Sequence, residues 1–386
     1  VGENVELNIS INNSIISGHD VSFGYIFDHY GDMLGNHSIT NSILEHSNGM
    51  SETGDFNIFD NEHIDQENLQ INIDPEFLSL YDHGGYYSKY YHLYASSPAI
   101  NKGDQSTFDS DGTIVDIGAH PYIIDHSNDF WYVDAYENDG DISGTGTIDN
   151  PFKSIRSGIN FAANNHTVYV DPGTYYEHIV ISDDLSLIST QGRDVTTISG
   201  LGSDTPESYS PLIGLDGGST LINNEGVLID GFTLEENHAW SGAGIQSWGI
   251  SADVNLKNLI IQNNMANNSG GGLEFGQCEC TINLDNVDIL NNTAGARGGG
   301  INSYNLNLVL NDVTIDGNRT LNGYANGTQG GAGLHYYYTN GTPDSILISN
   351  STISNNIIEE TENGKGGGIF VEGLDHLNLT NVAITG

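Results

Sequence analysis

The sequence predicts an all-β solenoid, a parallel β-helix, and three observations indicate this fold. Glycine-rich turns recur, ending at Gly244, Gly272, Gly300, Gly333 and Gly368, which are steps of 28, 28, 33 and 35 residues. An asparagine recurs in phase with them, at Asn237, Asn264, Asn292, Asn318 and Asn356. Short apolar–polar alternations lie between these markers. Two markers that share one drifting period are typical of a repeat architecture.

The pattern within one repeat explains why such units stack. In residues 254–261 apolar and polar side chains alternate, so every second side chain points to the same face. One coil cannot bury that face alone, whereas stacked coils form a continuous core. Glycine at the turns supplies positive φ without steric cost, and asparagine tolerates the left-handed region. We expect the recurrent asparagines of successive coils to form a hydrogen-bonded ladder.

Composition excludes several classes of function. Nine Lys and Arg residues face 51 Asp and Glu residues, a net charge of −42, so nothing in the chain would neutralise the phosphates of a nucleic acid. No apolar run is long enough to predict a membrane span. Abundant Asn, Gly, Thr and Tyr with little Lys favour a secreted protein at the cell surface.

The two cysteines, Cys278 and Cys280, are separated by one residue. The sequence leaves open a strained local bridge or two packed thiols, and favours the packed thiols.

Residues 1–125 are interpreted as terminal coils and the C-terminal end region of a β-helix. Alternating runs cover residues 5–11, 13–16 and 41–44. The later segments Asp74-Pro75-Glu76-Phe77, residues 97–104 (SPAINKGD) and Asp116-Ile117-Gly118-Ala119 resemble the last coils of secreted bacterial right-handed parallel β-helix proteins of the pectin-lyase-like superfamily. That resemblance implies a right-handed coil.

Residues 126–200 resemble the opposite end of the same superfamily and are interpreted as a linker, an N-terminal cap and the first coils of a second β-helix. The segments that carry the resemblance are 131–134 (WYVD), 150–155 (NPFKSI) and 168–175 (VYVDPGTY). Ile155 and Ile159 recur at helical spacing, which predicts one short helix that closes the open end of the stack.

Residues 201–386 are interpreted as Gly- and Asn-rich coils that remain uncapped, because residues 377–384 still have the coil pattern. Two interpretations stay open: a window of a longer tandem protein, or separate copies that stack head-to-tail through their β-helix ends. We therefore predict a non-enzymatic extracellular structural protein, the subunit of a surface filament or stalk, whose partners are further copies of itself. The alternative is a polysaccharide-binding or polysaccharide-degrading β-helix of the lyase or hydrolase class, with a surface polysaccharide as partner.

Calcium is the one candidate cofactor. Asp139, Asp141, Ser143, Thr145 and Asp149 place oxygen atoms at alternate positions around Gly144, which is the spacing of a calcium loop. Asn150 stands where an EF-hand has its bidentate glutamate, so a plain turn remains the alternative. A second candidate set is Asp109, Asp111 and Asp116.

No catalytic constellation is recognisable. The superfamily includes lyases that need a base beside calcium-binding carboxylates, yet the basic residues of the coils lie outside acidic clusters: Arg193, Lys257, Arg297, Arg319 and Lys365. Asp183 and Asp184 are adjacent and point to opposite faces of an extended segment, so both cannot serve one bond. For the tyrosines of residues 86–94 and 336–338, packing is favoured over sugar stacking.

Overall fold

The structure is a computed structural model. It describes residues 10–12, 14–16, 37–44, 64–71, 93, 97–110, 113–118, 128–136, 144–181, 183–201, 210–216, 226–276, 280–321, 329–337, 345–359, 364–374 and 376–386. The chain forms two compact units, Val1–Ser127 and Asn128–Gly386.

The first unit contains a parallel sheet of four strands. They are β1 (Ser10–Asn12), β2 (Ile15–Ile16), β3 (His37–Leu44) and β4 (Ile64–Ile71), and β3 pairs with each of the others. The alternating runs predicted the first three. The strand β4 was not predicted, because its eight residues include few apolar ones and its position depends on pairing with β3.

The predicted helix follows the first strand of the second unit, β5 (Phe130–Val133). The helix α3 (Ile155–Phe161) is capped by Ser154, whose side chain accepts a hydrogen bond from the Ser157 amide. The Glu177 carboxylate accepts bonds from the amides of Ile155 (2.9 Å) and Arg156 (3.0 Å), which satisfies two further free donors of the first turn. Ile155, Ile159 and Phe161 are buried.

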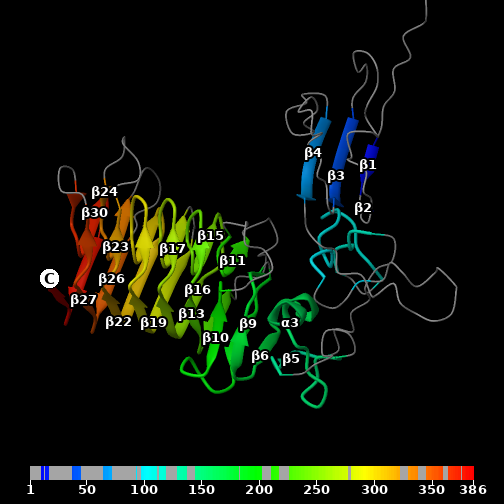
Figure 1. The fold of residues 1–386 in the computed structure, drawn as a ribbon, viewed down its shortest axis with the longest axis horizontal. Coiled ribbons are helices and arrows are strands. Elements are labelled where there is room, and N and C mark those ends of the chain that lie inside the picture. Colours follow the sequence, from blue (N-terminus) through cyan, green and yellow to red (C-terminus); the bar gives the residue numbers. More distant parts are fainter. Residues whose placement is uncertain are drawn as a thin grey trace, which may run out of the picture. The chain divides into compact units, whose positions relative to one another are not determined.

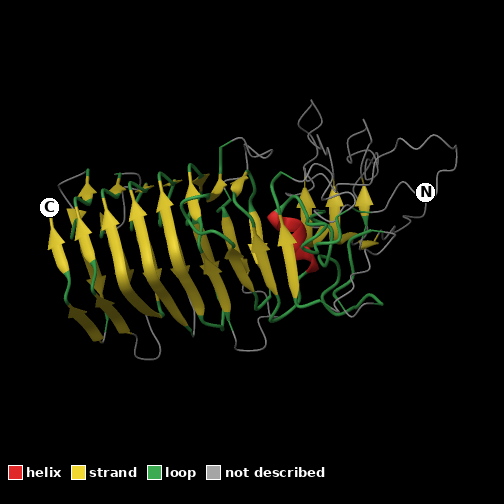
Figure 2. Ribbon diagram, turned by 90° about the horizontal axis from the view of Figure 1, so that it is seen from below, coloured by secondary structure: helices red, strands yellow, loops and turns green. Residues whose placement is uncertain are grey.

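The rest of the second unit is a stack of coils (Figures 1 and 2). The 14-stranded sheet contains β5 (Phe130–Val133), β6 (Thr167–Val170), β7 (Gly173–Tyr175), β9 (Ser186–Ser189), β10 (Thr196–Ser199), β12 (Val227–Asp230), β13 (Thr233–Glu235), β16 (Val254–Gln262), β19 (Thr281–Leu290), β22 (Asn307–Asp316), β26 (Ser345–Ser349), β27 (Thr352–Ser354), β31 (His376–Thr380) and β32 (Ala383–Thr385). The seven-stranded sheet contains β8 (Ile179–Ile181), β11 (Ile213–Asp216), β15 (Ile245–Trp248), β18 (Leu273–Gly276), β21 (Ile301–Tyr304), β25 (Leu334–Tyr337) and β30 (Ile369–Glu372). Two small sheets contain β14 (His238–Ala239), β17 (Met265–Ala266), β20 (Thr293–Ala294), β23 (Arg319–Thr320) and β28 (Ile357–Ile358), and β24 (Gln329–Gly330) with β29 (Gly364–Lys365).

All pairs between these strands are parallel, and each strand pairs with its counterpart in the next coil. The fold is a right-handed parallel β-helix, which confirms the fold class expected from the sequence.

Single left-handed residues make one corner of the coil. The long strands β16, β19 and β22 contain Asn258 (φ 49°), Asn286 (φ 56°) and Asp312 (φ 54°). In β16 the alternation of burial is interrupted there, because Lys257 and Asn258 are both exposed while Leu256 and Leu259 are buried. The left-handed residue thus turns the strand and restores the inward phase of the apolar side chains.

The predicted asparagine ladder is confirmed. Asn292 is fully buried, and its Oδ1 accepts bonds from the amide nitrogen (3.0 Å) and Nδ2 (3.1 Å) of Asn264. Its Nδ2 donates to the Ile261 carbonyl (2.8 Å) and to Oδ1 of Asn318 (3.1 Å). Asn237 and Asn356 continue the ladder in the outer coils. The first glycine of each predicted turn has positive φ, at Gly242, Gly270, Gly298, Gly331 and Gly366.

Cys280 is disulfide-bonded, and the only other cysteine in the sequence is Cys278. The expectation of packed thiols is therefore wrong for Cys280, whose sulfur is oxidised; Cys278 lies outside the described residues.

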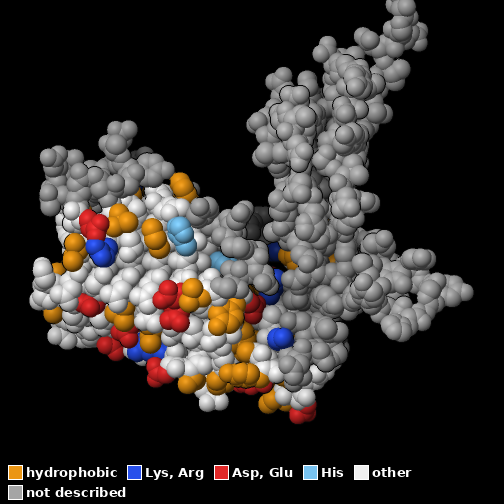
Figure 3. All heavy atoms as spheres, in the orientation of Figure 1, with side chains coloured by type: hydrophobic (Ala, Val, Ile, Leu, Met, Phe, Trp, Pro, Cys, Tyr) orange, Lys and Arg blue, Asp and Glu red, His pale blue; other side chains and the backbone are white. Residues whose placement is uncertain are grey.

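The structure also bears on two expectations from composition, the scarcity of basic side chains and the lack of a membrane span. Figure 3 shows few Lys and Arg side chains on the face it presents, in line with the net charge of −42. No helix in the described part of the chain has the length and apolar character needed to cross a membrane.

Candidate functional site

The outer face of the seven-stranded sheet carries the best-formed constellation of polar and aromatic side chains. Strand register places two outward rows side by side on this face. The first row is Gln246, Glu274, Asn302, His335 and Phe370, and the second is Trp248, Gly276, Tyr304, Tyr337 and Glu372. Because successive coils stack in register, each row crosses five coils.

The first four residues of the first row form a continuous hydrogen-bonded ladder. Oε2 of Glu274 accepts a bond from Nε2 of Gln246 (3.1 Å), and Oε1 accepts one from Nδ2 of Asn302 (3.0 Å). Nδ1 of His335 lies 2.8 Å from Oδ1 of Asn302. Since the Asn302 amide group donates to Glu274, its oxygen faces the histidine, and Nδ1 of His335 carries the proton. The donors of the ladder therefore all point toward the Glu274 carboxyl group.

The ladder is buried although it lies on the outside of the coil. Glu274 is 3 % exposed and His335 is 2 % exposed. Burial raises the pKa of Glu274, against the opposing effect of bonds from Gln246, Ser241 and Asn302. Burial also lowers the pKa of His335 from 6.5 to about 3, and the positive charge of Arg297 adds to this effect. His335 further stacks on Phe370, with ring centroids 5.4 Å apart. Both shifts favour the uncharged forms, as expected in a dry site.

The second row is a strip of aromatic rings beside the ladder. The ring centroids of Trp248 and Tyr304 are 5.0 Å apart in an edge-to-face arrangement, and those of Tyr304 and Tyr337 are 6.0 Å apart. Trp248 is 43 % exposed, so part of its indole faces solvent. Burial, with the nearby charge of Glu274, raises the pKa of Tyr304 to about 12, and its phenol is neutral at physiological pH. Of the predicted tyrosine cluster, Tyr337 belongs to this strip, whereas Tyr336 points inward and is fully buried.

The first predicted calcium loop falls partly outside the described residues, which contain Thr145 and Asp149 but not Asp139, Asp141 or Ser143. Thr145 and Asp149 are exposed, and Oγ1 of Thr145 lies 3.2 Å from Oγ1 of Thr147. The calcium prediction for this loop stays a prediction.

The second predicted set brings Asp109 and Asp116 together, while Asp111 is not described. Oδ2 of Asp109 accepts a bond from the Asp116 amide (3.1 Å), and Oδ1 of Asp116 accepts one from the Asn101 amide (2.8 Å). These bonds tie two turns of the backbone together. Within the described ranges, no group of three or more His, Cys, Asp and Glu side chains is arranged to hold a metal ion.

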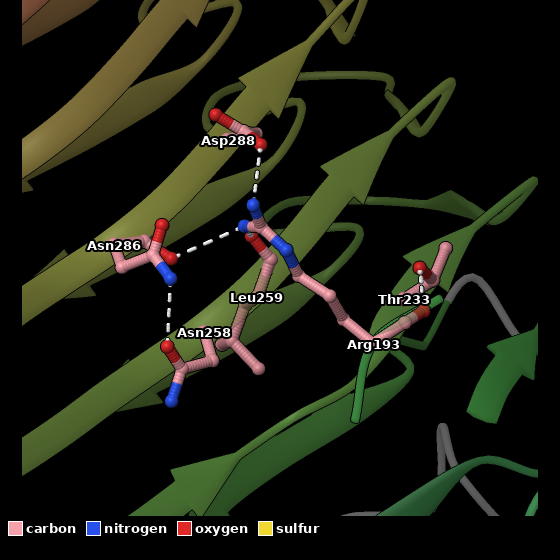
Figure 4. A network of polar contacts seen from close by, with 6 residues as sticks. All are labelled: Arg193, Thr233, Asn258, Leu259, Asn286 and Asp288. Atoms are coloured by element: carbon pink, nitrogen blue, oxygen red, sulfur yellow. Dashed lines mark hydrogen bonds and ion pairs between the residues drawn. The ribbon is translucent and has the colours of Figure 1, made fainter. Parts of the chain in front are cut away.

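Arg193, considered above as a catalytic base, connects three coils instead (Figure 4). Its guanidinium donates to the carbonyls of Leu259 (2.8 Å) and Asn286 (3.2 Å) and pairs with Asp288 (3.1 Å). Thr233 in turn donates to the Arg193 carbonyl (2.8 Å). All of these groups belong to the coil framework, so the arginine stabilises the stack.

Two other basic residues also have structural partners. Arg319 forms an ion pair with Glu359. The Lys365 ammonium lies 5.6 Å from the centroid of the Phe370 ring. These contacts agree with the surface interpretation that the sequence favoured for the basic residues.

Comparison with known proteins adds to the fold. No protein-family model and no curated protein matches the chain. Among solved structures, the pectin methylesterase from Aspergillus niger is 12 % identical, covers 68 % of this chain and 87 % of its own, and has a TM-score of 0.36. The pectin methylesterase PemA from Erwinia chrysanthemi is 12 % identical, with coverages of 66 % and 81 % and a TM-score of 0.29. The PL6 family alginate lyase AlyGC is 11 % identical, with coverages of 98 % and 58 % and a TM-score of 0.30.

The similarity to these structures concerns the fold alone. The parallel sheets agree with the resemblance seen in the sequence, which is confirmed at the level of fold, and at these identities no residue role is transferred. The main functional prediction, a non-enzymatic filament subunit, is wrong by this comparison: the similar structures are named as enzymes of pectin and alginate. The alternative, a polysaccharide-binding or polysaccharide-degrading β-helix, agrees better.

The polar ladder was not predicted, although the sequence contains a signal for it. Each residue of the first row is the second residue after a glycine turn: Gln246 follows Gly244-Ile245, Glu274 follows Gly272-Leu273, and the same holds for Asn302, His335 and Phe370. The aromatic row stands two positions further on. Aligning the repeats on their glycines would have placed both rows, because parallel in-register coils put equivalent positions side by side.

Proposed function

We propose that this protein binds a polysaccharide along the aromatic strip formed by Trp248, Tyr304 and Tyr337. The single observation that supports this most is the strip itself: three rings from separate coils, with Tyr304 in contact with both of the others and Trp248 43 % exposed. Aromatic rings offer flat apolar surfaces to the C–H faces of sugar rings, and binding sites combine such surfaces with a few oriented polar groups. The names of the structures with a similar fold agree with this class of ligand.

Binding is proposed here, and not cleavage, because of the state of Glu274. Each of its carboxyl oxygens accepts a hydrogen bond from an amide side chain, and the residue is 3 % exposed. A general acid has to lie within hydrogen-bonding reach of the glycosidic oxygen. Glu274 therefore supports the shape of the site and does not touch the sugar.

Two further elements of the proposal concern location and calcium. The bonded Cys280 is consistent with an oxidising compartment, because structural disulfides persist mainly in secreted proteins. A secreted, extracellular location therefore accompanies the proposed polysaccharide ligand. We retain calcium as the proposed cofactor of the loop that contains Asp139 and Asp149.

The test is affinity electrophoresis against a panel of neutral and acidic polysaccharides, with tryptophan fluorescence on soluble oligosaccharides. We expect Trp248→Ala to weaken binding about tenfold, the loss of roughly 1.4 kcal/mol that one stacked ring supplies. Trp240→Ala is the matched control, since Trp240 is 51 % exposed and follows β14 in a different sheet. The proposal is wrong if no polysaccharide is retained, or if both variants weaken binding equally. Release of reducing ends or of unsaturated products by the wild-type protein would contradict the choice of binding over cleavage.

A further inference from the structure

One position in the aromatic row carries no side chain. Register aligns Trp248 with Gly276, Gly276 with Tyr304, and Tyr304 with Tyr337. Trp248 and Tyr304 are therefore two coils apart. With a strand spacing of about 4.8 Å, rings standing straight out from these strands would lie about 9.5 Å apart.

The observed rings are much closer than that. The centroids of Trp248 and Tyr304 are 5.0 Å apart, with an interplanar angle of 60°. The Tyr304 ring leans over Gly276: a Cβ built on this glycine would lie 2.7 Å from Cζ of Tyr304 and closer still to Cε1. The glycine does not have positive φ, so the backbone itself does not require it. The space above Gly276 is thus occupied by the tyrosine ring.

We infer that Gly276 is a positioning residue, which lets Tyr304 reach Trp248 and so makes the strip continuous for a linear oligosaccharide. This inference rests on the proposed function. It adds the residue that makes the strip continuous and the length of the ligand that the strip accommodates. The strip spans three coil steps from Trp248 to Tyr337, about 14 Å, so an extended oligosaccharide contacts all three rings and a monosaccharide contacts one.

The substitution Gly276→Ala tests this inference, because a methyl group displaces the Tyr304 ring and leaves the strand intact. Gly214→Ala is the matched control: Gly214 faces outward on β11 of the same sheet, and its added Cβ would meet its nearest neighbour, Cγ of Pro211, at 3.7 Å, an ordinary contact. Near-UV circular dichroism reports the coupling of Trp248 with Tyr304 without any ligand. Affinity is measured for short and long oligomers of the polysaccharide that the wild-type protein retains.

We expect Gly276→Ala to change the near-UV signal and to weaken binding of the long oligomer about three- to tenfold, the contribution of one aromatic contact. Binding of the monosaccharide should stay the same. The melting temperature should fall, because the displaced Tyr304 ring loses packing, and Gly214→Ala should change none of these. A changed ring signal with unchanged affinity for the long oligomer overturns the positioning role and leaves the proposed function standing. An unchanged near-UV signal would show that Gly276→Ala does not displace the Tyr304 ring, and the inference would then be wrong.

A double-mutant cycle guards against a variant that does not fold. In a Tyr304→Ala background the methyl group has no ring to meet, so Gly276→Ala should then have no effect on melting temperature. If the alanine destabilises both backgrounds equally, Tyr304 is not what the glycine accommodates, and the inference is wrong. If the wild-type protein retains no polysaccharide, the proposed function fails, while the ring signal and the cycle still report on the geometry.

Discussion

Protonation of His335 should destabilise the second unit by an amount that the structure defines. The side chain is 2 % exposed, and its pKa falls from 6.5 to about 3 on folding. Between these two values the unfolded chain binds a proton that the folded chain does not. Stability therefore rises with pH across this window and is lost as pH falls. At about 1.4 kcal/mol per pKa unit, the full effect is roughly 5 kcal/mol, and about 3 kcal/mol of it falls between pH 6.5 and 4.5.

The assay compares the wild-type protein with His335→Gln by urea unfolding from pH 4.5 to 8, followed by far-UV circular dichroism. Many carboxylates titrate over the same range, but they contribute equally to both proteins and cancel in the difference. The lost packing of the imidazole is a constant offset, visible above pH 7. We expect the advantage of the wild-type protein to shrink by about 1.4 kcal/mol per pH unit below pH 6.5. A difference that stays flat between pH 7.5 and 4.5, or that grows on acidification, would refute the reasoning.

Four further outcomes are expected. Burial raises the pKa of Glu274, so its neutral form stabilises the fold below pH 4.5 and this contribution is lost as pH rises. The same urea series on Glu274→Gln should therefore show the wild-type protein losing stability relative to the variant above pH 4.5. This pH dependence has the opposite sign to that of His335. Asn292→Ala leaves the Asn264 amide and the Ile261 carbonyl without partners and should cost about 2 to 6 kcal/mol in urea unfolding, against less than about 1 kcal/mol for the half-buried Asn283→Ala; equal losses would contradict the ladder. If an acidic polysaccharide is among the ligands, its affinity should rise between 20 and 200 mM salt, because screening weakens its repulsion by a protein of net charge −42; a titration at both salt concentrations measures this, and a fall in affinity would argue against it. Calcium in the loop around Asp139 predicts a melting temperature that falls with EDTA and recovers with CaCl2, and Asp139→Asn should abolish this response; a melting temperature indifferent to EDTA would identify the loop as an ordinary turn.

The parts of the fold that the sequence predicted are those that depend on local chemistry. Glycines with positive φ mark the turns of each coil, because few other residues tolerate this backbone conformation. The recurrent asparagines mark a fixed corner for another reason. The left-handed residue is the one before them, such as Asn263 or Asn291, while their own side chains bond to the neighbouring coil. The ladder through Asn264, Asn292 and Asn318 follows from the repeat alone, since equivalent positions of parallel coils are neighbours. The helix Ile155–Phe161 was recognisable from its apolar spacing.

The candidate site could not be predicted in the same way, because its residues differ from coil to coil. Glutamate, asparagine and histidine occupy one row. Recurrence of one residue type reveals the asparagine ladder, but it cannot reveal a row whose members all differ. The strand β4 was missed for a related reason, since its few apolar residues do not by themselves indicate a strand. In both cases pairing with the strand of the neighbouring coil fixes the position of these residues.

What the sequence alone determined about this protein is the winding of the chain: where it turns, which side chains face inward, and that parallel coils share one core. Those features depend on backbone preferences and on an alternation that is legible within a single repeat. Tertiary structure decided that Glu274 and His335 are buried, which shifts their pKa values toward the uncharged forms, and that Tyr304 leans across Gly276 onto Trp248. Each of these depends on distances between residues about 28 or more positions apart, or on the solvent that their neighbours exclude, and the free energy of a buried charge or an aromatic contact is set by those surroundings.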